Sequence, residues 1–449
     1  MLLSIALGSG AVTFYLRDLA AVPFHPDESV YIYMSRDFDT LVLQRDPLAL
    51  AWQPREPLFP EARKRLLDAP LTRYLDGLGR WLGGYTVADL PTDWAWGAPW
   101  EANRSAIPSP ALLLAARAPS AILGALTAVV LFWIGVQMRG IAVGLIAAGL
   151  YALDPLTLLH TQRAMAEGAL MFFSTLTICA TIVLAERCNA LSQFNARVLT
   201  LGAVVGLLAG LAMNSKQSAI VMLPLALAVS AGVLWRRPWL RARRLAAIAA
   251  LCGVIVLGWA ATLWLLNPIL YREPLAIAQA MVAMRVELTR EQVAVNGASQ
   301  PELILASAPA RLAATVTELY WQLPAGWDVP VYLEQLKPPM DVYLSNPLHV
   351  WLREPLASIT LLLLSAIGVV GSATRLARAR LGATTRAEQV VWLWAALTLG
   401  LIALTVPLNW QRYFMPLLPA SRLFVALGCV ALWQLARRRA RSASPVCRT

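Results

Sequence analysis

The chain has 449 residues, of which 58% are hydrophobic and only 14% charged, and its mean hydropathy is +0.58. These values exclude an ordinary soluble protein and predict an all-α, polytopic integral membrane protein. The net charge of +12 does not indicate nucleic-acid binding, because the basic residues collect in short runs between apolar stretches, where topology and lipid headgroups explain them. The five cysteines show neither metal-site nor disulfide spacing.

The chain begins with an apolar stretch that extends to Leu16. No basic residue precedes it and no small-residue cleavage site follows it, which favours a retained anchor over a cleaved signal peptide. At about 15 residues it is shorter than the ~20 that cross a bilayer, so a misplaced start codon and a few missing residues are both open alternatives.

A long polar stretch, 17–110, is too rich in proline, tryptophan and charge to cross a bilayer. Within it, apolar residues from Leu67 to Leu82 recur at helical spacing, while Arg73, Asp76 and Arg80 occupy the other side. We expect this helix to lie in the membrane interface. Three tryptophans that follow favour the same depth, namely Trp94, Trp96 and Trp100.

About ten apolar stretches are predicted to cross the membrane. They are the first one and those near 111–137, 141–159, 165–185, 198–213, 217–235, 245–266, 348–371, 389–407 and 413–436. A second long polar stretch, 267–347, precedes the last three, and its first part looks helical. The predicted organisation is a transmembrane module at 1–266 that includes the first long loop, a second loop region at 267–347, and C-terminal helices with a basic tail at 348–449.

The basic residues define the orientation. Under this count of spans they fall on one side, at Arg139, in the 186–197 link, and in clusters at 236–244, 375–386 and 437–441. The positive-inside rule places that side in the cytoplasm. Both long loops, with their interfacial helices, are therefore expected to face outward, together with the short turns near 160–164, 214–217 and 409–412.

Isolated charged groups gather on the predicted outer side. The carboxylates are Asp27, Glu28 and Glu167, and the cations are Arg163, Lys216 and Arg412. Outward cations oppose the topological bias, and a bound anion would explain them. Carboxylates can act as a general base or hold a metal, and Arg and Lys recognise phosphate. The pattern therefore predicts phosphoryl-linked chemistry at the outer surface.

Each of these residues also has a structural interpretation. Arg163 and Glu167 are four residues apart and could pair on one helix. Lys216 could extend to the lipid headgroups, and Arg412 could anchor the chain at the interface. His25 is favoured as a structural or solvated residue, since no metal-site spacing accompanies it.

The order of the motifs resembles the fold-C (GT-C) polyprenyl-phosphate-sugar glycosyltransferases, especially the superfamily of protein O-mannosyltransferases and lipid A aminoarabinose transferases. Besides the acidic pair, the likeness rests on Leu67-Asp68-Ala69-Pro70-Leu71, Ala152-Leu153-Asp154-Pro155, Gln162-Arg163-Ala164-Met165-Ala166-Glu167, Asn214-Ser215-Lys216-Gln217-Ser218 and Arg412-Tyr413-Phe414-Met415-Pro416. The chain departs from the family at Asp68-Ala69-Pro70, where His-Pro-Pro is frequent, and at Asp154-Pro155, where Ser-Pro is frequent.

The resemblance implies a membrane glycosyltransferase that moves a sugar from a polyprenyl-phosphate donor to an acceptor hydroxyl or amine, with inversion. It implies that Asp27 is the catalytic base, that Glu28 lies beside it, and that Glu167 is the second acidic residue. The resemblance leaves a lipid, a glycan or a protein as the acceptor. The site is expected to face outward from the plasma membrane.

The same resemblance implies that the lipid phosphate is bound by Arg163, Lys216, Arg412 and Tyr413. A divalent metal ion is an open alternative, and its ligands would be drawn from Asp27, Glu28, Glu167 and His25. The sequence does not identify the sugar, the acceptor or the oligomeric state.

Two other classes of function compete with this interpretation. A transporter or flippase of lipid-linked sugars could line a pathway with the same charges, but few ionisable groups lie deep in the spans and no clear internal repeat is visible. A non-catalytic membrane subunit is the third alternative.

Overall fold

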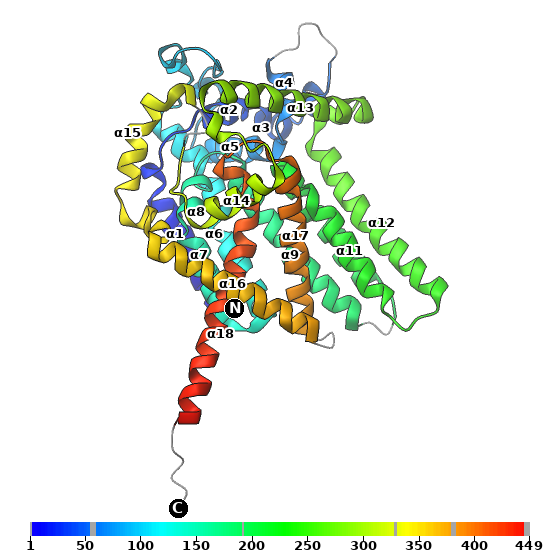
Figure 1. The fold of residues 1–449 in the computed structure, drawn as a ribbon. Helices are drawn as coiled ribbons and strands as arrows, with labels where there is room; N and C mark the ends of the chain where they lie inside the picture. The colour runs from blue at the N-terminus through cyan, green and yellow to red at the C-terminus, as the bar shows by residue number, and fades with distance from the viewer. Residues whose placement is uncertain (1, 54–59, 191–192, 327–329, 379–382, 444–449) are drawn as a thin grey trace, which may run out of the picture.

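The protein is described by a computed structural model that covers residues 2–53, 60–190, 193–326, 330–378 and 383–443. Helices dominate these residues, and the only strand-like pairing among them is an isolated antiparallel bridge between Ile304 and Leu408. Figure 1 shows long helices that run side by side and shorter helices that lie across one end of them. The predicted all-α fold is confirmed.

Nine helical segments in the described ranges are long and apolar enough to cross a membrane. Their helices are α1 (Leu2–Arg17) with η1 (Leu19–Ala21), α6 (Pro110–Arg139), α9 (Ala166–Ala190), α10 (Ala196–Ser215), η6 (Gln217–Val221) with α11 (Met222–Trp235), α12 (Arg241–Leu266), α16 (Pro355–Arg378), α17 (Ala383–Thr405) and α18 (Leu418–Ala443). The first candidate span is Leu2–Ala21, of 20 residues, so it extends beyond the predicted end at Leu16.

The stretch predicted as one span at 141–159 is instead two helices, α7 (Ile141–Ala152) and α8 (Pro155–His160). The 12 residues of α7 reach ~18 Å, short of the ~30 Å hydrocarbon core. The chain breaks at Asp154, whose carboxylate caps α8 by accepting a 2.9 Å hydrogen bond from the Leu156 amide. The stretch still connects the two ends of the bundle, since Arg139 lies at the arginine-rich end and Glu167 at the cavity. The sequence analysis did not predict the break, although an aspartate followed by a proline is a signal for a new helix start.

Shorter helices fill the two polar stretches. The first contains α2 (Pro26–Met34), α3 (Arg36–Phe38), a π-helical turn η2 (Asp39–Leu43), α4 (Pro60–Leu67) and α5 (Pro70–Leu82); the second contains α13 (Pro274–Ser299), α14 (Ala308–Tyr320) and α15 (Leu333–Leu344). In Figure 1, α13 crosses the end of the bundle near α2 and α4. These helices form the layer in which a site can be built.

The helix predicted at Leu67–Leu82 corresponds to α5, and its polar side faces the protein. Arg73 lies 3.1 Å from Asp37, and Arg80, which is fully buried, forms an ion pair with Asp39. Trp81 and Leu82 are exposed on the outer side. Most of α5 is therefore buried in the protein, with Arg73 and Arg80 in ion pairs, and its exposed apolar groups lie at the C-terminal end. Its location in the membrane interface stays a prediction.

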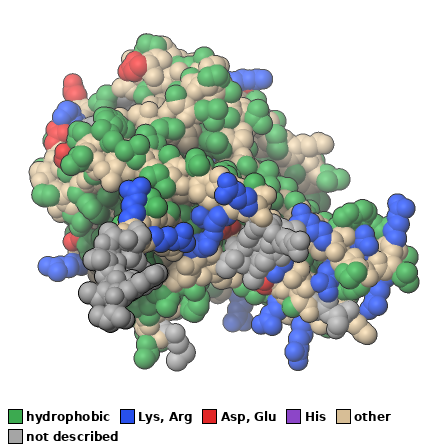
Figure 2. Space-filling view, turned by 60° about the horizontal axis from the view of Figure 1, so that its bottom comes forward, with side chains coloured by type: hydrophobic (Ala, Val, Ile, Leu, Met, Phe, Trp, Pro, Cys, Tyr) green, Lys and Arg blue, Asp and Glu red, His purple; other side chains and the backbone are tan. Residues whose placement is uncertain are grey.

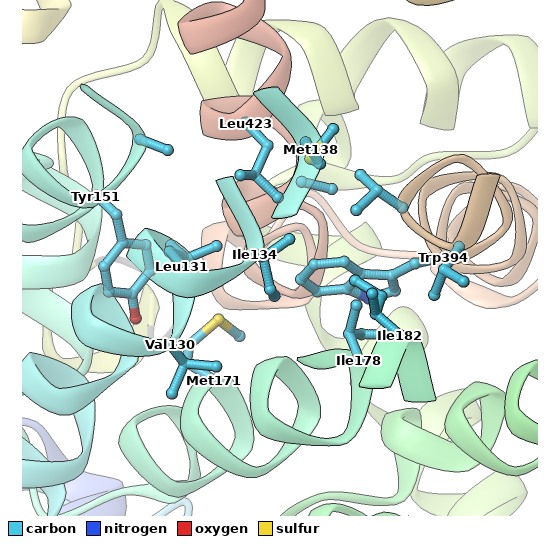
Figure 3. Close-up of a cluster of buried hydrophobic side chains, with 14 of the residues drawn as sticks. Val130, Leu131, Ile134, Met138, Tyr151, Met171, Ile178, Ile182, Trp394 and Leu423 are labelled. Carbon is cyan, nitrogen blue, oxygen red and sulfur yellow. The ribbon is translucent and has the colours of Figure 1, made fainter. Parts of the chain in front are cut away.

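The largest core cluster lies between α6, α7, α9, α17 and α18, and Figure 3 shows part of it. Trp394 of α17 is 1% exposed and lies beside Ile178 and Ile182 of α9. This packing joins the helix that begins at Ala166 to α17, the helix that precedes the 409–417 segment. The segments that carry Glu167 and Arg412 are therefore held by one core.

Arginine side chains gather on the end of the bundle opposite α13, as Figure 2 shows. Ion pairs join the helices there, since Arg386 lies 3.1 Å from Glu186 and Arg139 lies 3.0 Å from Glu388. This distribution supports the orientation expected from the positive-inside rule.

A glycine contact between α10 and α12 gives a test of the packing. A Cβ added at Gly206 would meet the carbonyl oxygen of Ile255, whereas one at Gly253 on α12 would meet nothing. We expect Gly206→Ala to destabilise the protein by about 1–3 kcal/mol through overpacking, and Gly253→Ala to be neutral or slightly stabilising. Thermal unfolding in nanodiscs measures both, and equal effects would contradict the packing.

Candidate active site

A cavity of about 1200 Å³ lies at the loop end of the bundle, bounded by α13 and by the outer ends of several spans. One part of its lining is charged: Asp27, Asp68, Glu167, Lys216, Arg285 and Arg412. Another part is apolar: Ile220, Leu401, Ile402, Val406 and Pro416. A cavity with one ionic side and one apolar side suits an amphipathic ligand.

Asp27 is placed in this cavity by the start of α2. His25 is the N-cap residue, and its Nδ1 atom accepts a 3.1 Å hydrogen bond from the Asp27 amide. Pro26 occupies the first helical position, where its lack of an N–H is harmless. The Asp27 carboxylate remains 22% exposed and accepts a hydrogen bond from Nη1 of Arg412. A carboxylate at a helix N-terminus is stabilised in its ionised form.

Glu28 has a different environment from its neighbour. It is fully buried, and both of its oxygens accept 2.7 Å hydrogen bonds from the Arg117 guanidinium of α6. The amides of Ala164 and His25 each donate a further bond of 2.9 Å. Burial alone would raise the pKa of Glu28, but the charges of Arg117 and Arg163 outweigh it and hold that pKa below its usual range. Glu28 therefore joins three segments and does not line the cavity.

Arg117 was missed by the sequence analysis. Besides Glu28, its guanidinium donates to the carbonyl oxygens of Leu19 at 3.1 Å and Val22 at 2.8 Å, which fixes the chain just before α2. The available signal was a lone arginine inside the apolar stretch 111–137, because such residues are costly in a span unless they have a partner.

Glu167 and Lys216 form the second ion pair of the cavity. Glu167 lies in the first turn of α9 and is 1% exposed, and its Oε1 atom is 2.7 Å from the Lys216 ammonium. Lys216 lies between α10 and η6, is 22% exposed, and is 5.5 Å from the ring centre of Tyr413. Two cations, Lys216 and Arg412, therefore meet two carboxylates in the cavity. The sequence analysis expected these four residues on one face and did not predict which of them pair.

Arg163 is placed differently from the prediction. Its side chain is 2% exposed and donates a 3.3 Å hydrogen bond to the Pro23 carbonyl. Among the described residues, Arg163 is not part of the cavity lining, although Met165 and Glu167 are. Its hydrogen bond to Pro23 holds the side chain against the loop before α2. The prediction that it binds the phosphate is not supported by this arrangement.

Arg285 of α13 supplies a cavity cation that the prediction did not include. Its Nη2 atom lies 3.3 Å from Oδ1 of Asp68 and also donates to the Leu67 carbonyl. This contact joins the second loop to the Leu67-Asp68-Ala69-Pro70-Leu71 motif. The sequence indicated a helix here but gave no sign of which face it presents to the site.

Tyr31 is a further lining residue that the sequence analysis did not select. It follows Asp27 by four residues and so shares its helix face. Burial raises the pKa of Tyr31 well above its ordinary value, and the charges of Asp68, Asp27 and Glu167 add to this effect. Burial likewise raises the pKa of Asp68, with Asp27 contributing. Three carboxyl groups thus surround one phenol.

A second, smaller cavity of about 120 Å³ lies behind the turn that holds Arg412. Trp410 lines both cavities, and Glu318 of α14 lines the smaller one. Gln411 fixes the turn by donating to the Leu323 carbonyl and accepting from the Ala325 amide, both at 2.8 Å. Glu318 is 3% exposed, and burial raises its pKa to about 7.

The residues named as ligands of a possible metal ion are engaged by other groups of the protein. In the described parts of the chain, no three His, Cys, Asp or Glu side chains form a group that could hold a metal ion. Both oxygens of Glu28 are occupied by Arg117, and Glu167 is paired with Lys216. His25 accepts from the Asp27 amide through Nδ1. We therefore derive no step of the chemistry through a metal.

One family model matches part of the chain. Residues 65–267 match the family of dolichyl-phosphate-mannose-protein mannosyltransferases. This range contains Glu167 and Lys216 and most of the motifs on which the predicted resemblance rests. No curated protein sequence gives a significant match to the chain.

Solved structures show the same arrangement of helices. The Archaeoglobus fulgidus oligosaccharyltransferase tethered with an acceptor peptide is 13% identical, with a TM-score of 0.50, and the match covers 97% of this chain and 50% of that one. The chain has the GT-C fold. The predicted resemblance to the GT-C glycosyltransferases is thereby confirmed.

Two further structures match less well. The archaeal enzyme in complex with an inhibitory peptide and a dolichol-phosphate gives 14% identity, a TM-score of 0.46, and coverage of 98% of this chain and 52% of that one. The S. cerevisiae protein O-mannosyltransferase complex bound to the sugar donor gives 16% identity, a TM-score of 0.38, and coverage of 59% and 34%. The chain spans about half the length of the archaeal proteins that it matches.

Removing Arg117 should show how strongly the site depends on its pair with Glu28. Arg117→Met leaves a buried carboxylate without its partner, which we expect to cost about 3–5 kcal/mol of stability. The control, Lys337→Met, breaks the exposed pair with Asp341 and should change stability by less than about 0.5 kcal/mol. Thermal and denaturant unfolding measure both, and similar small losses would contradict the assigned role.

Glu318 predicts a pH dependence of stability. Its pKa is raised from 4.5 to about 7 in the folded protein. The unfolded chain therefore releases this proton first, so stability should fall as the pH rises from about 4.5 to 7 and then level off. Glu318→Gln should remove this fall, whereas Glu334→Gln, at an exposed glutamate, should leave it. Melting temperatures between pH 4.5 and 8 test this, and parallel curves for wild type and Glu318→Gln would refute it.

Proposed function

We propose that this protein is a membrane glycosyltransferase that moves a sugar from a polyprenyl-phosphate carrier to an acceptor hydroxyl or amine. The observation that supports this most directly is the shared cavity. Asp27, whose carboxylate is 22% exposed, lines it together with Lys216, Arg412 and apolar side chains of α17. A base, phosphate-binding cations and a surface for a lipid chain are the three parts that this reaction needs.

The donor phosphate is assigned to the space between Lys216 and Arg412, beside Tyr413. Both cations are held near their positions by carboxylates, so a phosphate gains two preorganised donors without large rearrangement. The polyprenyl chain would follow the apolar wall formed by Leu401 and Ile402 of α17. Burying that chain against apolar side chains contributes ~25 cal/mol per Å² of apolar surface.

Asp27 is assigned as the general base. It accepts the acceptor's proton while the acceptor oxygen or nitrogen attacks the anomeric carbon from the face opposite the phosphate, which inverts the configuration. Arg412 joins the two halves of the site, because its guanidinium bonds to Asp27 and lies beside the space assigned to the phosphate.

The leaving phosphate gains negative charge as the sugar departs. Lys216 and Arg412 therefore stabilise the transition state more than the bound donor, and loss of one such donor typically costs ~10²–10³ in rate. Glu167 holds Lys216 at the required place. Glu28 acts as a positioning residue for Asp27, through its bonds to Arg117 and the His25 amide.

The orientation follows from the basic face of the molecule. Arginines gather at the end of the bundle opposite the cavity, which supports, by the positive-inside rule, the proposal that the cavity faces the extracytoplasmic side of the plasma membrane. A donor carried by a membrane lipid would reach the cavity by lateral diffusion in the membrane.

A transporter of lipid-linked sugars fits less well. The broken helix pair α7 and α8 resembles the discontinuous helices of transporters. The charge at its break, Asp154, is however committed to Arg353 and Arg422, with all three side chains buried. None of these three described residues lines either cavity. The ionisable groups that do face a cavity lie at one end of the bundle.

Turnover of a panel of radiolabelled polyprenyl-phosphate sugars by purified protein in nanodiscs tests the proposal. We expect Asp27→Asn to lower turnover at least about a hundredfold, which corresponds to about 2.7 kcal/mol of transition-state stabilisation. Asp341→Asn, at an exposed aspartate of α15, is the matched control and should retain wild-type turnover.

Two results would contradict the proposed glycosyltransferase function. Equal turnover by wild type and Asp27→Asn would place the base elsewhere. Movement of unmodified lipid-linked sugar across the bilayer, without turnover of any donor by the folded protein, would favour the transporter.

A further inference from the structure

Four aromatic rings form a packed cluster at the rim of the large cavity. Trp94 contacts Trp100 and Tyr332, each at a ring-centre distance of 5.4 Å, and Trp96 lies 6.2 Å from Trp94. Trp94 is 2% exposed, so it acts as the core of the cluster. The cluster joins the first loop to the second, since Tyr332 belongs to η9 (Pro330–Tyr332).

Trp96 presents its ring to the cavity. It lines the cavity, is 50% exposed, and is supported from behind by Trp94 and by Tyr332 at 6.5 Å. A ring fixed in this way offers a flat apolar surface at small entropic cost. Trp94 also lines the cavity, and its buried indole N–H has no hydrogen-bond acceptor among the described residues. The rim thus combines a flat apolar ring with a polar donor that awaits an acceptor.

The charges around this ring are already neutralised. Arg63 lies 3.6 Å from Glu291, and Lys64 forms an ion pair with Asp93 beside the cluster. All four residues line the cavity. A charged ligand would have to compete with these pairs, whereas a neutral ligand with hydroxyl groups can donate to Asp93 and accept from Lys64 without separating charge.

We propose that this rim is the acceptor site and that the acceptor is a neutral carbohydrate. One sugar ring stacks its C–H face on Trp96, while its hydroxyls bond to Asp93, Lys64 and the Trp94 N–H. This inference rests on the proposed function, because the transferred sugar is expected to arrive at Asp27 in the same cavity.

The transfer balances without any further reactant. The acceptor hydroxyl oxygen forms a bond to the anomeric carbon of the donor sugar, and its proton passes to Asp27. The bond between the anomeric carbon and the phosphate oxygen breaks, and the electron pair leaves with the polyprenyl phosphate between Lys216 and Arg412. The products are a longer glycan and the lipid phosphate.

A peptide and an anionic lipid are the two competing acceptors. Aromatic-lined grooves also bind extended peptides, and paired cations of the same cavity are assigned here to a phosphate. The proposal therefore rests on the flat face of Trp96 together with the hydroxyl partners beside it, and the test distinguishes the three acceptors.

Carbohydrate binding can be measured without a donor, so the result does not depend on turnover. The full-length protein is placed in nanodiscs free of maltoside detergent, which would itself supply a sugar. Saturation-transfer NMR is then recorded with neutral tri- and tetrasaccharides of mannose, galactose or arabinose. We expect saturable binding of at least one series, weakened about tenfold or more by Trp96→Ala and less by Trp96→Phe.

Trp321→Ala is the matched control, because Trp321 is 47% exposed and, within the described residues, lies outside the cavity lining. It should bind like wild type. Once a donor is known, Trp96→Ala should raise the acceptor KM while leaving kcat within about twofold.

The proposal is overturned if no neutral oligosaccharide binds saturably, or if Trp96→Ala and Trp321→Ala weaken binding equally. Saturable binding of serine- and threonine-containing peptides or of anionic lipid, lost in Trp96→Ala, would instead assign this rim to another acceptor. Failure of donor turnover with intact, Trp96-dependent oligosaccharide binding would contradict the proposed function alone.

Discussion

The buried pair between Glu28 and Arg117 is the constraint on which the rest of the site depends. An ionised pair in a membrane protein is stable only when nearly every donor and acceptor is satisfied, and here the two oxygens of Glu28 accept four hydrogen bonds. The pair fixes α6 against the start of α2 and against the turn before α9. Asp27 is therefore aimed into the cavity because its neighbour is held in place.

The cavity also contains ion pairs, but their charged groups are less enclosed than Glu28 and Arg117. Asp27 with Arg412, and Glu167 with Lys216, are pairs that remain partly open to the cavity, unlike Glu28 with Arg117. Each cation is stabilised before a ligand arrives, yet each can exchange its carboxylate for a phosphate. Four segments far apart in the sequence supply these groups, so the arrangement requires the packed bundle beneath it.

Much of this could be predicted from the sequence, because apolar length, charge asymmetry and isolated outward charges are local signals. Asp27, Glu167, Lys216 and Arg412 were identified in this way and share the cavity. The separate roles of Glu28 and Arg163 could not be predicted. Glu28 and Asp27 are neighbours on α2 but point in different directions, and the burial of Arg163 depends on tertiary contacts. The break at Asp154 was not predicted either, although an aspartate followed by a proline signals a helix start.

The measurement that tests the account most directly is an experimental structure of the protein in lipid with undecaprenyl phosphate. The account predicts phosphate oxygens within hydrogen-bonding reach of Lys216 and Arg412, about 2.7–3.2 Å, with the lipid chain along α17 and Asp27 facing the phosphate's free side. A headgroup bound at the basic face of the bundle, or a cavity that stays empty of lipid at saturating concentration, would contradict it.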